Sequence, residues 1–440
     1  MQVLMLSPEP PYPLNSGGAF RTASLLHYFA RFAEVDLILI SESGAPALLP
    51  QGLVRSQKVI SLPRHNRGLI ARYVRNASRA LRRVPPLIDR LSGLSAPIER
   101  AIRELIGNEG RVYDFGIVEH FWCAPYVDLL SSCCKRTVIN LHNIESVLHN
   151  RYSGSGDGFS NGVNSVIGEK LIRAGQRRFA AASRKLESDL LPRYSAVLTT
   201  SEHDASLVRA IAPEAHVHVY PNSLPWVDAP KTDLPKVDGP EYPRLVFSAN
   251  FEYHPNIDAV AFLVGEIWPK IRALRVLRML QKPHPELRLR LVGRGDRSIR
   301  HLLPSGPVEE TGIEVTGPVE DARAEIAQAT IVVAPLRAGS GTRLKIIEAW
   351  AAARCVVATP LAAEGLGARD GIDIALASDA AGLAAAIVRL LDDPVGRQRL
   401  AAGGRRTFED KYSWESAWKS LDLDLQLTHQ SGLNGYTGNF

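Results

Sequence analysis

Short apolar runs recur along the chain, and stretches with apolar residues at helical spacing separate them. Buried strands of a parallel sheet have this continuous apolar character, and their alternation with helices is typical of doubly wound α/β folds. We therefore predict parallel sheets in both halves of the chain. The predicted strands are residues 3–6, 35–40, 115–119, 138–141 and 196–200, followed by 245–248, 287–292, 313–315, 331–334, 356–358 and 372–376.

A proline-rich stretch with little periodicity separates the two halves and is typical of a domain linker. The 440 residues also exceed what one hydrophobic core usually serves. We predict two Rossmann-like domains that face a cleft, followed by a terminal helix that aromatic side chains anchor against a neighbour. The predicted segments are an N-terminal domain at 1–222, a linker at 223–243, a C-terminal domain at 244–410, and a terminal helix and tail at 411–440.

Composition narrows the class of protein. No apolar run approaches the ~20 residues that cross a bilayer, and residues 1–6 lead into a proline-rich segment that does not resemble a secretory leader. The four cysteines form neither a disulfide framework nor a CxxC metal site. We expect a cytoplasmic protein, with peripheral contact at the inner face of the membrane as an option.

The net charge is +6, and the excess lies between residues 64 and 111. Arg72, Arg75, Arg79 and Arg82 recur there at helical spacing, which predicts an amphipathic basic helix. Its basic face is either solvated or in contact with an anionic membrane or a phosphorylated acceptor. Nucleic acid is not expected, because no aromatic residues interleave with the charge. The Gly- and Ser-rich residues 155–165 form either a lid or a slack loop before a helix at 169–191.

Residues 334–349 combine a predicted strand, a glycine-rich turn and a predicted helix. Gly339 and Gly341 allow close backbone approach, and the free N–H groups at a helix start attract phosphate oxygens. Arg343 and Lys345 add cationic donors. Glu348 is expected to accept hydrogen bonds from a ribose diol, unless it is a salt-bridged helix acid. This junction predicts a nucleotide-binding site at the carboxyl edge of the second sheet.

Two histidines follow predicted strands of the first domain. His120 comes after residues 115–119, and His142 comes after residues 138–141. The carboxyl ends of parallel strands meet at one edge of a sheet, so both histidines are expected there. Asn143 and Glu145 follow closely, and this polar group serves either the acceptor side of a site or its own loop.

The chain resembles the GT-B fold glycosyltransferases, in particular the retaining family 4 type, through motifs that follow one another in family order. The motifs are 10–13 with 16–18 and Arg21, 220–223, 247–259, 291–296, 315–319 and 334–349. The resemblance implies transfer of a sugar from a nucleotide-diphosphate sugar to a glycan, lipid-linked or small-molecule acceptor. It also implies retention of configuration, with neither a metal ion nor a cofactor. No metal-binding DxD motif is expected, since residues 422–424 fall in the predicted terminal helix.

The resemblance assigns residue roles on both sides of the predicted site. His120 would position the transferred sugar, and Arg343, Lys345 and Glu348 would act on the departing diphosphate and ribose. Gly317 would lie beside the base, and Glu364 with Gly365 would reach the sugar or phosphate unless Glu364 is an ordinary loop acid. The implied donor-binding set is Gly17, Gly18, Asn250, Gly317, Gly339, Ser340, Gly341, Thr342, Glu364 and Gly365, and the acceptor-side set is Arg21, His142 and Asn143.

Two departures from the family pattern keep other functions open. Ser340 stands where many members have an acid, and residues 250–256 lack the usual Arg and Lys. We therefore expect Arg343 and Lys345 to neutralise the diphosphate. The alternatives are other GT-B chemistry, such as nucleotide-sugar epimerisation or inverting transfer, and a catalytically silent partner protein.

Overall fold

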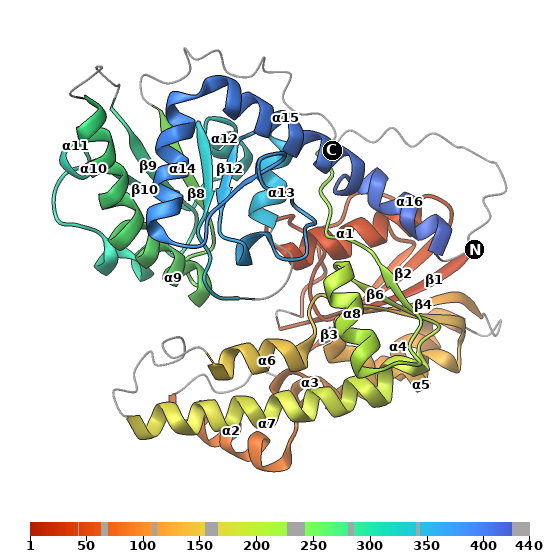
Figure 1. The fold of residues 1–440 in the computed structure, drawn as a ribbon. Helices are drawn as coiled ribbons and strands as arrows, with labels where there is room; N and C mark the ends of the chain where they lie inside the picture. Colours follow the sequence, from red (N-terminus) through yellow and green to blue (C-terminus); the bar gives the residue numbers. More distant parts are fainter. Residues whose placement is uncertain are drawn as a thin grey trace. The chain divides into compact units, whose positions relative to one another are not determined.

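The computed structural model describes residues 1–42, 44–62, 69–107, 112–154, 166–226, 243–279, 286–339 and 344–424. The chain divides into two compact units (Figure 1). Unit 1 comprises Met1–Ser223 together with the segment that begins at Ala417, and unit 2 comprises Leu224–Ser416. The predicted linker falls largely on residues 227–242, which lie outside the described residues, as do residues 155–165 and the tail from residue 425.

Unit 1 is built on a parallel sheet in the order β3-β2-β1-β4-β5-β6-β7. Its strands are β1 (Gln2–Ser7), β2 (Glu34–Ser41), β3 (Ser56–Ser61), β4 (Tyr113–Glu119), β5 (Cys134–Asn140), β6 (Ala196–Thr199) and β7 (Val217–Val219). Its helices are α1 (Gly17–Ala30), α2 (Leu69–Arg82), α3 (Pro86–Leu91), α4 (Ser95–Ile106), α5 (Val127–Ser131), α6 (Glu145–Gly154), α7 (Val166–Leu190), α8 (Glu202–Ile211) and α16 (Trp414–Asp424).

The two faces of this sheet carry separate cores. Successive side chains of a strand point to opposite faces, so Val3 and Met5 pack with α1 and α16 while Leu4 and Leu6 pack with α3, α4 and α8. Helix α7 contacts α2 and α6, which lie beside it in Figure 1. All four cysteines of the chain are buried free thiols.

Unit 2 has a second parallel sheet, in the order β10-β9-β8-β11-β12-β13. Its strands are β8 (Arg244–Ser248), β9 (Arg288–Val292), β10 (Ile313–Gly317), β11 (Ile331–Ala334), β12 (Val356–Ala358) and β13 (Ala375–Leu376). Its helices are α9 (His254–Phe262), α10 (Trp268–Met279), α11 (Val308–Thr311), α12 (Ala322–Ala327), α13 (Leu344–Ala351), α14 (Ala380–Asp392) and α15 (Pro394–Lys411).

Each sheet has a switch point, where the strand order reverses and the loops on either side diverge. In unit 1 the switch lies between β1 and β4, and in unit 2 it lies between β8 and β11. Open α/β sheets bind their ligands at the carboxyl ends of strands beside such a point. The loops that follow these four strands are therefore where the candidate sites are built.

The basic helix predicted in the first half is α2, but its faces differ from the expectation. Arg79 is buried and its guanidinium lies 2.8 Å from Asp89, whereas Val74 and Leu81 are 64% and 77% exposed. Arg82 also pairs with Asp89, at 2.9 Å. Arg79 therefore does not lie on the exposed basic face that the spacing predicted, because Asp89 of α3 pairs with it. The side chain of Arg72 lies outside the described residues.

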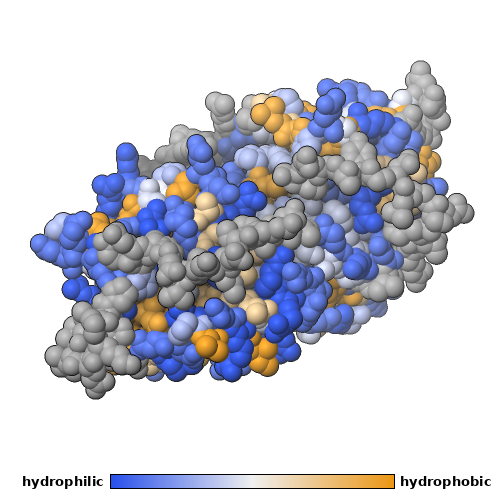
Figure 2. All heavy atoms as spheres, turned by 90° about the horizontal axis from the view of Figure 1, so that it is seen from above, coloured by the Kyte–Doolittle hydropathy of each residue, from blue (hydrophilic) through white to orange (hydrophobic). Residues whose placement is uncertain are grey.

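The surface in Figure 2 shows hydrophobic residues as separate spots among hydrophilic ones on the face in view. Among the described residues, none of the helices combines the length and apolarity that crossing a bilayer requires. The described helices thus match the sequence, in which no apolar run is long enough to cross a bilayer.

Candidate functional site

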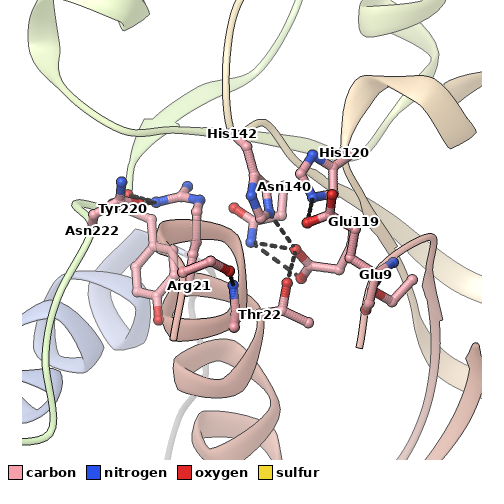
Figure 3. A network of polar contacts seen from close by, with 12 residues as sticks. Glu9, Arg21, Thr22, Glu119, His120, Asn140, His142, Tyr220 and Asn222 are labelled. Carbon is pink, nitrogen blue, oxygen red and sulfur yellow. Dashed lines mark hydrogen bonds and ion pairs between the residues drawn. The ribbon is translucent and has the colours of Figure 1, made fainter. Parts of the chain in front are cut away.

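A buried carboxylate organises the carboxyl edge of the unit 1 sheet (Figure 3). Glu119 is the last residue of β4 and is fully buried. Its Oε2 accepts hydrogen bonds from Thr22 Oγ1 at 3.1 Å, Asn140 Nδ2 at 3.0 Å and His142 Nε2 at 2.7 Å. Burial raises the pKa of Glu119, and Asn140 is first among the groups that oppose this rise. Helix α1 and the ends of β4 and β5 are thereby tied to one acceptor.

His120 lies between two aromatic rings at this edge. Its imidazole stacks on Trp122 with ring centroids 4.3 Å apart and on His142 with centroids 3.5 Å apart. Its backbone has a φ of 63°, a left-handed conformation that non-glycine residues adopt at a cost. The buried Nε2 has no hydrogen-bond partner, and its nearest carboxylate oxygen, Glu9 Oε2, is 3.5 Å away. The histidine is therefore held by packing, while one polar atom is left unsatisfied.

The start of helix α1 brings the predicted glycines to these histidines. Ser16 Oγ accepts a hydrogen bond from Ala19 N at 3.2 Å and so caps the helix, which places Gly17 and Gly18 in its first turn. A Cβ at position 18 would lie 2.8 Å from Glu9 Oε2, 3.6 Å from His142 Nδ1 and 3.8 Å from His120 Nε2. A side chain at position 18 would clash with Glu9, so glycine at this position lets Glu9 and the two histidines lie close to the start of α1.

Arg21, expected on the acceptor side, is buried one helical turn further on. Its Nη1 donates to the carbonyl oxygen of Tyr220 at 2.5 Å and to Asn222 Oδ1 at 3.0 Å. Its guanidinium also lies 4.9 Å from the centre of the Tyr220 ring. Burial lowers the pKa of Arg21 to about 10. The structure therefore gives Arg21 a supporting role, since it fixes the 220–223 motif against α1.

A second buried acid supports the histidine cluster from helix α6. Trp122 Nε1 donates to Glu145 Oε1 at 3.0 Å, and burial raises the pKa of Glu145 to about 7. Glu187 of α7 accepts a hydrogen bond from Ser146 N at 3.0 Å and so caps α6. Asn143 lies half-buried between His142 and this helix start. Glu145 thus braces the ring that stacks on His120.

In unit 2, close backbone contacts surround the end of β8. Gly293 has a φ of 140°, and a Cβ there would lie 1.9 Å from the carbonyl oxygen of Ala249. Only glycine permits this approach of the loop after β9 to the loop that contains Asn250. Gly317, at the end of β10, accepts a hydrogen bond from Gly293 N at 3.2 Å, and a Cβ on Gly317 would meet open space.

Lys345 joins the start of helix α13 to the end of β8. Its Nζ donates to Asn256 Oδ1 at 3.2 Å, and Asn256 Nδ2 donates to the carbonyl oxygen of Asn250 at 2.8 Å. Glu348 lies one turn further along α13 and is partly buried. Burial raises the pKa of Glu348 to about 6, and the charge of Lys345 opposes that rise. The structure therefore brings Asn250 and Lys345 into one network and sets Glu348 beside it.

Other predicted donor-site residues lie elsewhere or outside the described residues. Gly339 is buried with a φ of 111°, and Glu364 and Gly365 follow the short 3₁₀ turn after β12. Residues Ser340, Gly341, Thr342 and Arg343 lie outside the described residues. The expected roles of Arg343 and of the glycine-rich turn stay predictions.

Sequence reasoning missed the two carboxylates of the unit 1 cluster. Glu9 lies in a proline-rich turn after β1, where nothing in the sequence signals a partner. Glu119 did carry a signal, because it is the one acid that ends an otherwise apolar predicted strand, directly before His120. Asn256 was visible only as part of a motif.

Residues 242–393 match the family model described as glycosyl transferases group 1. A curated relative, the phosphatidyl-myo-inositol mannosyltransferase of Mycobacterium leprae (strain TN), is 35% identical over 133 residues. That match covers 29% of this chain and 35% of the relative, so it spans about a third of the relative's length.

Solved structures resemble nearly the whole chain. Sucrose-phosphate synthase from Thermosynechococcus elongatus has a TM-score of 0.65 at 18% identity and covers 97% of this chain and 99% of its own. Anabaena HepE, solved in complex with UDP and glucose, has a TM-score of 0.60 at 15% identity with the same coverage. At these identities the likeness shows the fold alone. The chain therefore has the two-domain GT-B fold, and its residues 242–393 are similar to the glycosyl transferases group 1 family.

Proposed function

We propose that this protein is a glycosyltransferase that moves a sugar from a nucleotide-diphosphate sugar to a hydroxyl group of a glycan, lipid-linked or small-molecule acceptor. We further propose that transfer proceeds with retention and without a metal ion. The observation that carries the proposal is the group 1 domain at residues 242–393, with Lys345 linked to Asn256 beside Glu348. The complex of HepE with UDP and glucose supports a nucleotide-sugar donor.

Unit 2 supplies donors and acceptors suited to a nucleoside diphosphate. The Lys345 ammonium and the free N–H groups at the start of α13 favour a developing diphosphate charge, which preorganised dipoles stabilise without reorganisation. Glu348, with a pKa of about 6, is mainly a carboxylate at neutral pH and can accept hydrogen bonds from ribose hydroxyls. Arg343 is proposed as the second cation.

Retention requires that the acceptor attack from the face that the diphosphate leaves. The bond between the anomeric carbon and the phosphate oxygen breaks, and a bond from the acceptor oxygen to that carbon forms. The acceptor proton moves to the departing phosphate oxygen, so no separate base is required. In this scheme unit 1 serves the acceptor and the transferred sugar through His120.

The first test is hydrolysis and transfer with a panel of UDP, GDP, dTDP and ADP sugars, followed as release of nucleotide diphosphate. Lys345→Ala should reduce kcat/KM by about 100-fold, because one charge-stabilising contact to the leaving group contributes ~2.7 kcal/mol. Lys270→Ala replaces an exposed lysine of the same unit and should leave the rate unchanged. Equal rates for both variants would contradict the proposed role of Lys345.

Product stereochemistry separates the proposal from its alternatives. NMR of the first-formed product should show an anomeric configuration identical to that of the donor. Inversion would favour an inverting transferase, and a changed sugar still attached to nucleotide would favour an epimerase. Absence of turnover together with nucleotide-sugar binding would favour a silent partner protein.

If α2 contacts an anionic membrane, its exposed residues must make that contact. Val74, Leu81, Arg82 and Arg83 are exposed, whereas Arg79 is buried. The double variant Leu81→Ser with Arg83→Glu should reduce sedimentation with anionic vesicles, while Arg79→Glu should chiefly lower the melting temperature. Unchanged sedimentation of the double variant would favour a solvated helix.

A further inference from the structure

Arg337, in the loop that follows β11, lies along one side of helix α9. Its Nη2 donates to Asp258 Oδ1 at 2.7 Å and its Nε donates to Oδ2 at 3.2 Å, while its Nη1 lies 3.4 Å from Glu266 Oε1. The guanidinium carbon also lies 4.4 Å from the centre of the Phe262 ring. These three partners are four residues apart, so they form one stripe along α9 and the π-helical turn after it. Arg337 therefore holds α9 through a two-point pairing, the most directional contact that arginine makes with a carboxylate.

A different side of α9 positions Lys345. Asn256 precedes Asp258 by two residues, and residues two apart on a helix do not face the same way. The buried Asn256 accepts a hydrogen bond from Lys345 Nζ at 3.2 Å and donates one to the carbonyl oxygen of Asn250 at 2.8 Å. Lys345 Nζ also lies 5.8 Å from the centre of the Phe247 ring. The place of this ammonium group therefore depends on where α9 holds the Asn256 amide.

The two cations stand at opposite ends of the connection between β11 and α13. Arg337 is the third residue after β11, and Lys345 is the second residue of α13. Both contact polar side chains of the same short helix, the first through Asp258 and the second through Asn256. A shift of α9 away from Arg337 would therefore also move the amide that Lys345 contacts.

The ion pair of Arg337 is too exposed to matter chiefly for global stability. The side chain of Arg337 is 43% exposed, and that of Asp258 is 26% exposed. Pairs of this kind contribute little to the free energy of unfolding, because water screens the charges and both side chains lose rotamer freedom. A two-point pair beside an aromatic ring can still fix local geometry. The main effect of Arg337 should therefore be on the position of α9.

We propose that Arg337 is a positioning residue, which holds α9 through Asp258 so that Asn256 keeps the Lys345 ammonium in place for the leaving diphosphate. The effect on sugar transfer rests on the proposed function, whereas the link from Arg337 to Lys345 does not. Arg337 acts without contact to the nucleotide, since its donors are directed at Asp258 and Glu266.

Kinetics of the full chain with the nucleotide sugar that turns over test this role. Arg337→Ala and Asp258→Ala should each lower kcat by about tenfold, because a misplaced charge-stabilising group slows the chemical step. Both should leave the melting temperature nearly unchanged. The double variant should also lose about tenfold, since the two changes break one link. Arg337→Lys keeps the charge and should restore part of kcat.

Two kinetic outcomes would overturn the proposal. A loss of about a hundredfold in the double variant would show that Arg337 and Asp258 act separately. A normal kcat for Asp258→Ala, with a reduced kcat for Arg337→Ala, would mean that Arg337 contacts the nucleotide itself.

The Lys345→Ala background isolates the link to Lys345. Arg337→Ala should have no further effect on kcat there, because the group that it positions is gone. A further tenfold loss would show that Arg337 acts independently of Lys345 and would also overturn the proposal. The control is Arg103→Ala, which breaks an exposed ion pair with Glu99 in unit 1 and should keep the kcat of the wild type.

Hydrogen exchange of the ligand-free full chain separates this proposal from the proposed function. Arg337→Ala should speed exchange in peptides from α9, at His254–Phe262, because loss of a holding contact raises local opening, whereas Arg103→Ala should not. Faster exchange there, without turnover of any nucleotide sugar by the wild type, would sustain the link while refuting the proposed function. Turnover by the wild type, with unchanged exchange and kcat in Arg337→Ala, would sustain the function and overturn the positioning role.

Discussion

Glu119 shows how one residue can determine the arrangement of a whole cluster. A buried carboxylate is costly unless several donors compensate for its lost hydration. Here Thr22, Asn140 and His142 provide that compensation from three different segments. The same bonds fix the orientation of His142, whose ring stacks on His120 with centroids 3.5 Å apart.

Removal of this carboxylate should be strongly destabilising. Glu119→Ala leaves three buried donors without an acceptor, and we expect a loss of about 3 kcal/mol or more in the free energy of unfolding. Urea unfolding followed by tryptophan fluorescence measures this loss, with exposed Glu104→Ala as the comparison. A loss below about 1 kcal/mol would mean that water replaces the carboxylate at little cost.

Removal of the charge on Glu348 should stabilise the protein, unlike removal of the Glu119 carboxylate. Its pKa is raised from 4.5 to about 6 by burial, so the folded state holds the proton more tightly than the unfolded state. Stability should therefore fall as the pH rises from about 4.5 to 6 and stay lower above that window, by up to about 2 kcal/mol. Glu348→Gln should stabilise the ligand-free protein at pH 7.5 but not at pH 4, while it weakens nucleotide binding.

The control is Glu309→Gln, which changes an exposed acid of unit 2. Melting temperatures at the two pH values give the comparison. If Glu348→Gln lowers the melting temperature at pH 7.5, the Glu348 carboxylate stabilises the fold through an ion pair, and its burial is not a cost that nucleotide binding offsets.

Residue-level prediction succeeded where the chain position implied the place in space. His120 and His142 were placed correctly at one sheet edge, because each directly follows an apolar strand. The contact of Glu9 with His120 was not predicted, because it depends on the path of the proline-rich loop after β1. No periodicity or propensity encodes such a long-range contact.

At the scale of elements, helix α16 closes unit 1 from the far end of the sequence. Ala417 and Leu421 are buried in the core beneath α1, and Trp418 Nε1 donates to the carbonyl oxygen of Ser24 at 3.1 Å. Tyr28 Oη donates to Asp422 Oδ1 at 2.7 Å. The aromatic anchor was predicted, and the terminal helix expected from residue 411 begins at Trp414, after residues 412–413 separate it from α15.

Leu421→Ala tests this closure. Loss of a fully buried leucine typically costs 2–5 kcal/mol, and we expect about 3 kcal/mol here because neighbouring α1 and β-strand side chains leave little room to collapse. Lys419→Ala, an exposed residue of the same helix, should change stability by less than about 0.5 kcal/mol. Similar losses for the two variants would show that α16 contributes through helix content and not through packing.

The strands of the two sheets differ in how well the sequence predicted them. Each predicted apolar run overlaps a strand of the two sheets, although only Ala375–Leu376 of the run 372–376 forms one. The central strands were predicted most fully, because central parallel strands are buried on both faces. Strands β3 and β7 were missed. Both lie at sheet edges, and their partly exposed sequences, such as Ser-Gln-Lys-Val-Ile-Ser in β3, lack a continuous apolar run. The apolar pattern of α2 also gave no sign of the ion pair between Arg79 and Asp89, because that pair depends on how α3 packs against α2.

At the scale of the molecule, the two units have different chemical character at their sheet edges. Unit 1 offers buried histidines with carboxylates, and unit 2 offers a lysine–asparagine network beside a partly buried acid. Carboxylates repel a diphosphate, whereas Lys345 attracts one. The proposed nucleotide should therefore bind to unit 2 even when no acceptor is present.

Hydrogen exchange of the full chain with UDP and GDP tests this division. The nucleotide that binds should slow exchange in peptides that contain residues 249–256 and 344–350, because ligand binding suppresses local opening where it makes contacts. Peptides from β2, at Glu34–Ser41, should exchange at an unchanged rate. At about 100 times its dissociation constant, the nucleotide should add ~2.7 kcal/mol to the stability of the state that binds it. Protection confined to the unit 1 histidine cluster would contradict the assignment, because the carboxylates of that cluster would then have to accommodate the diphosphate.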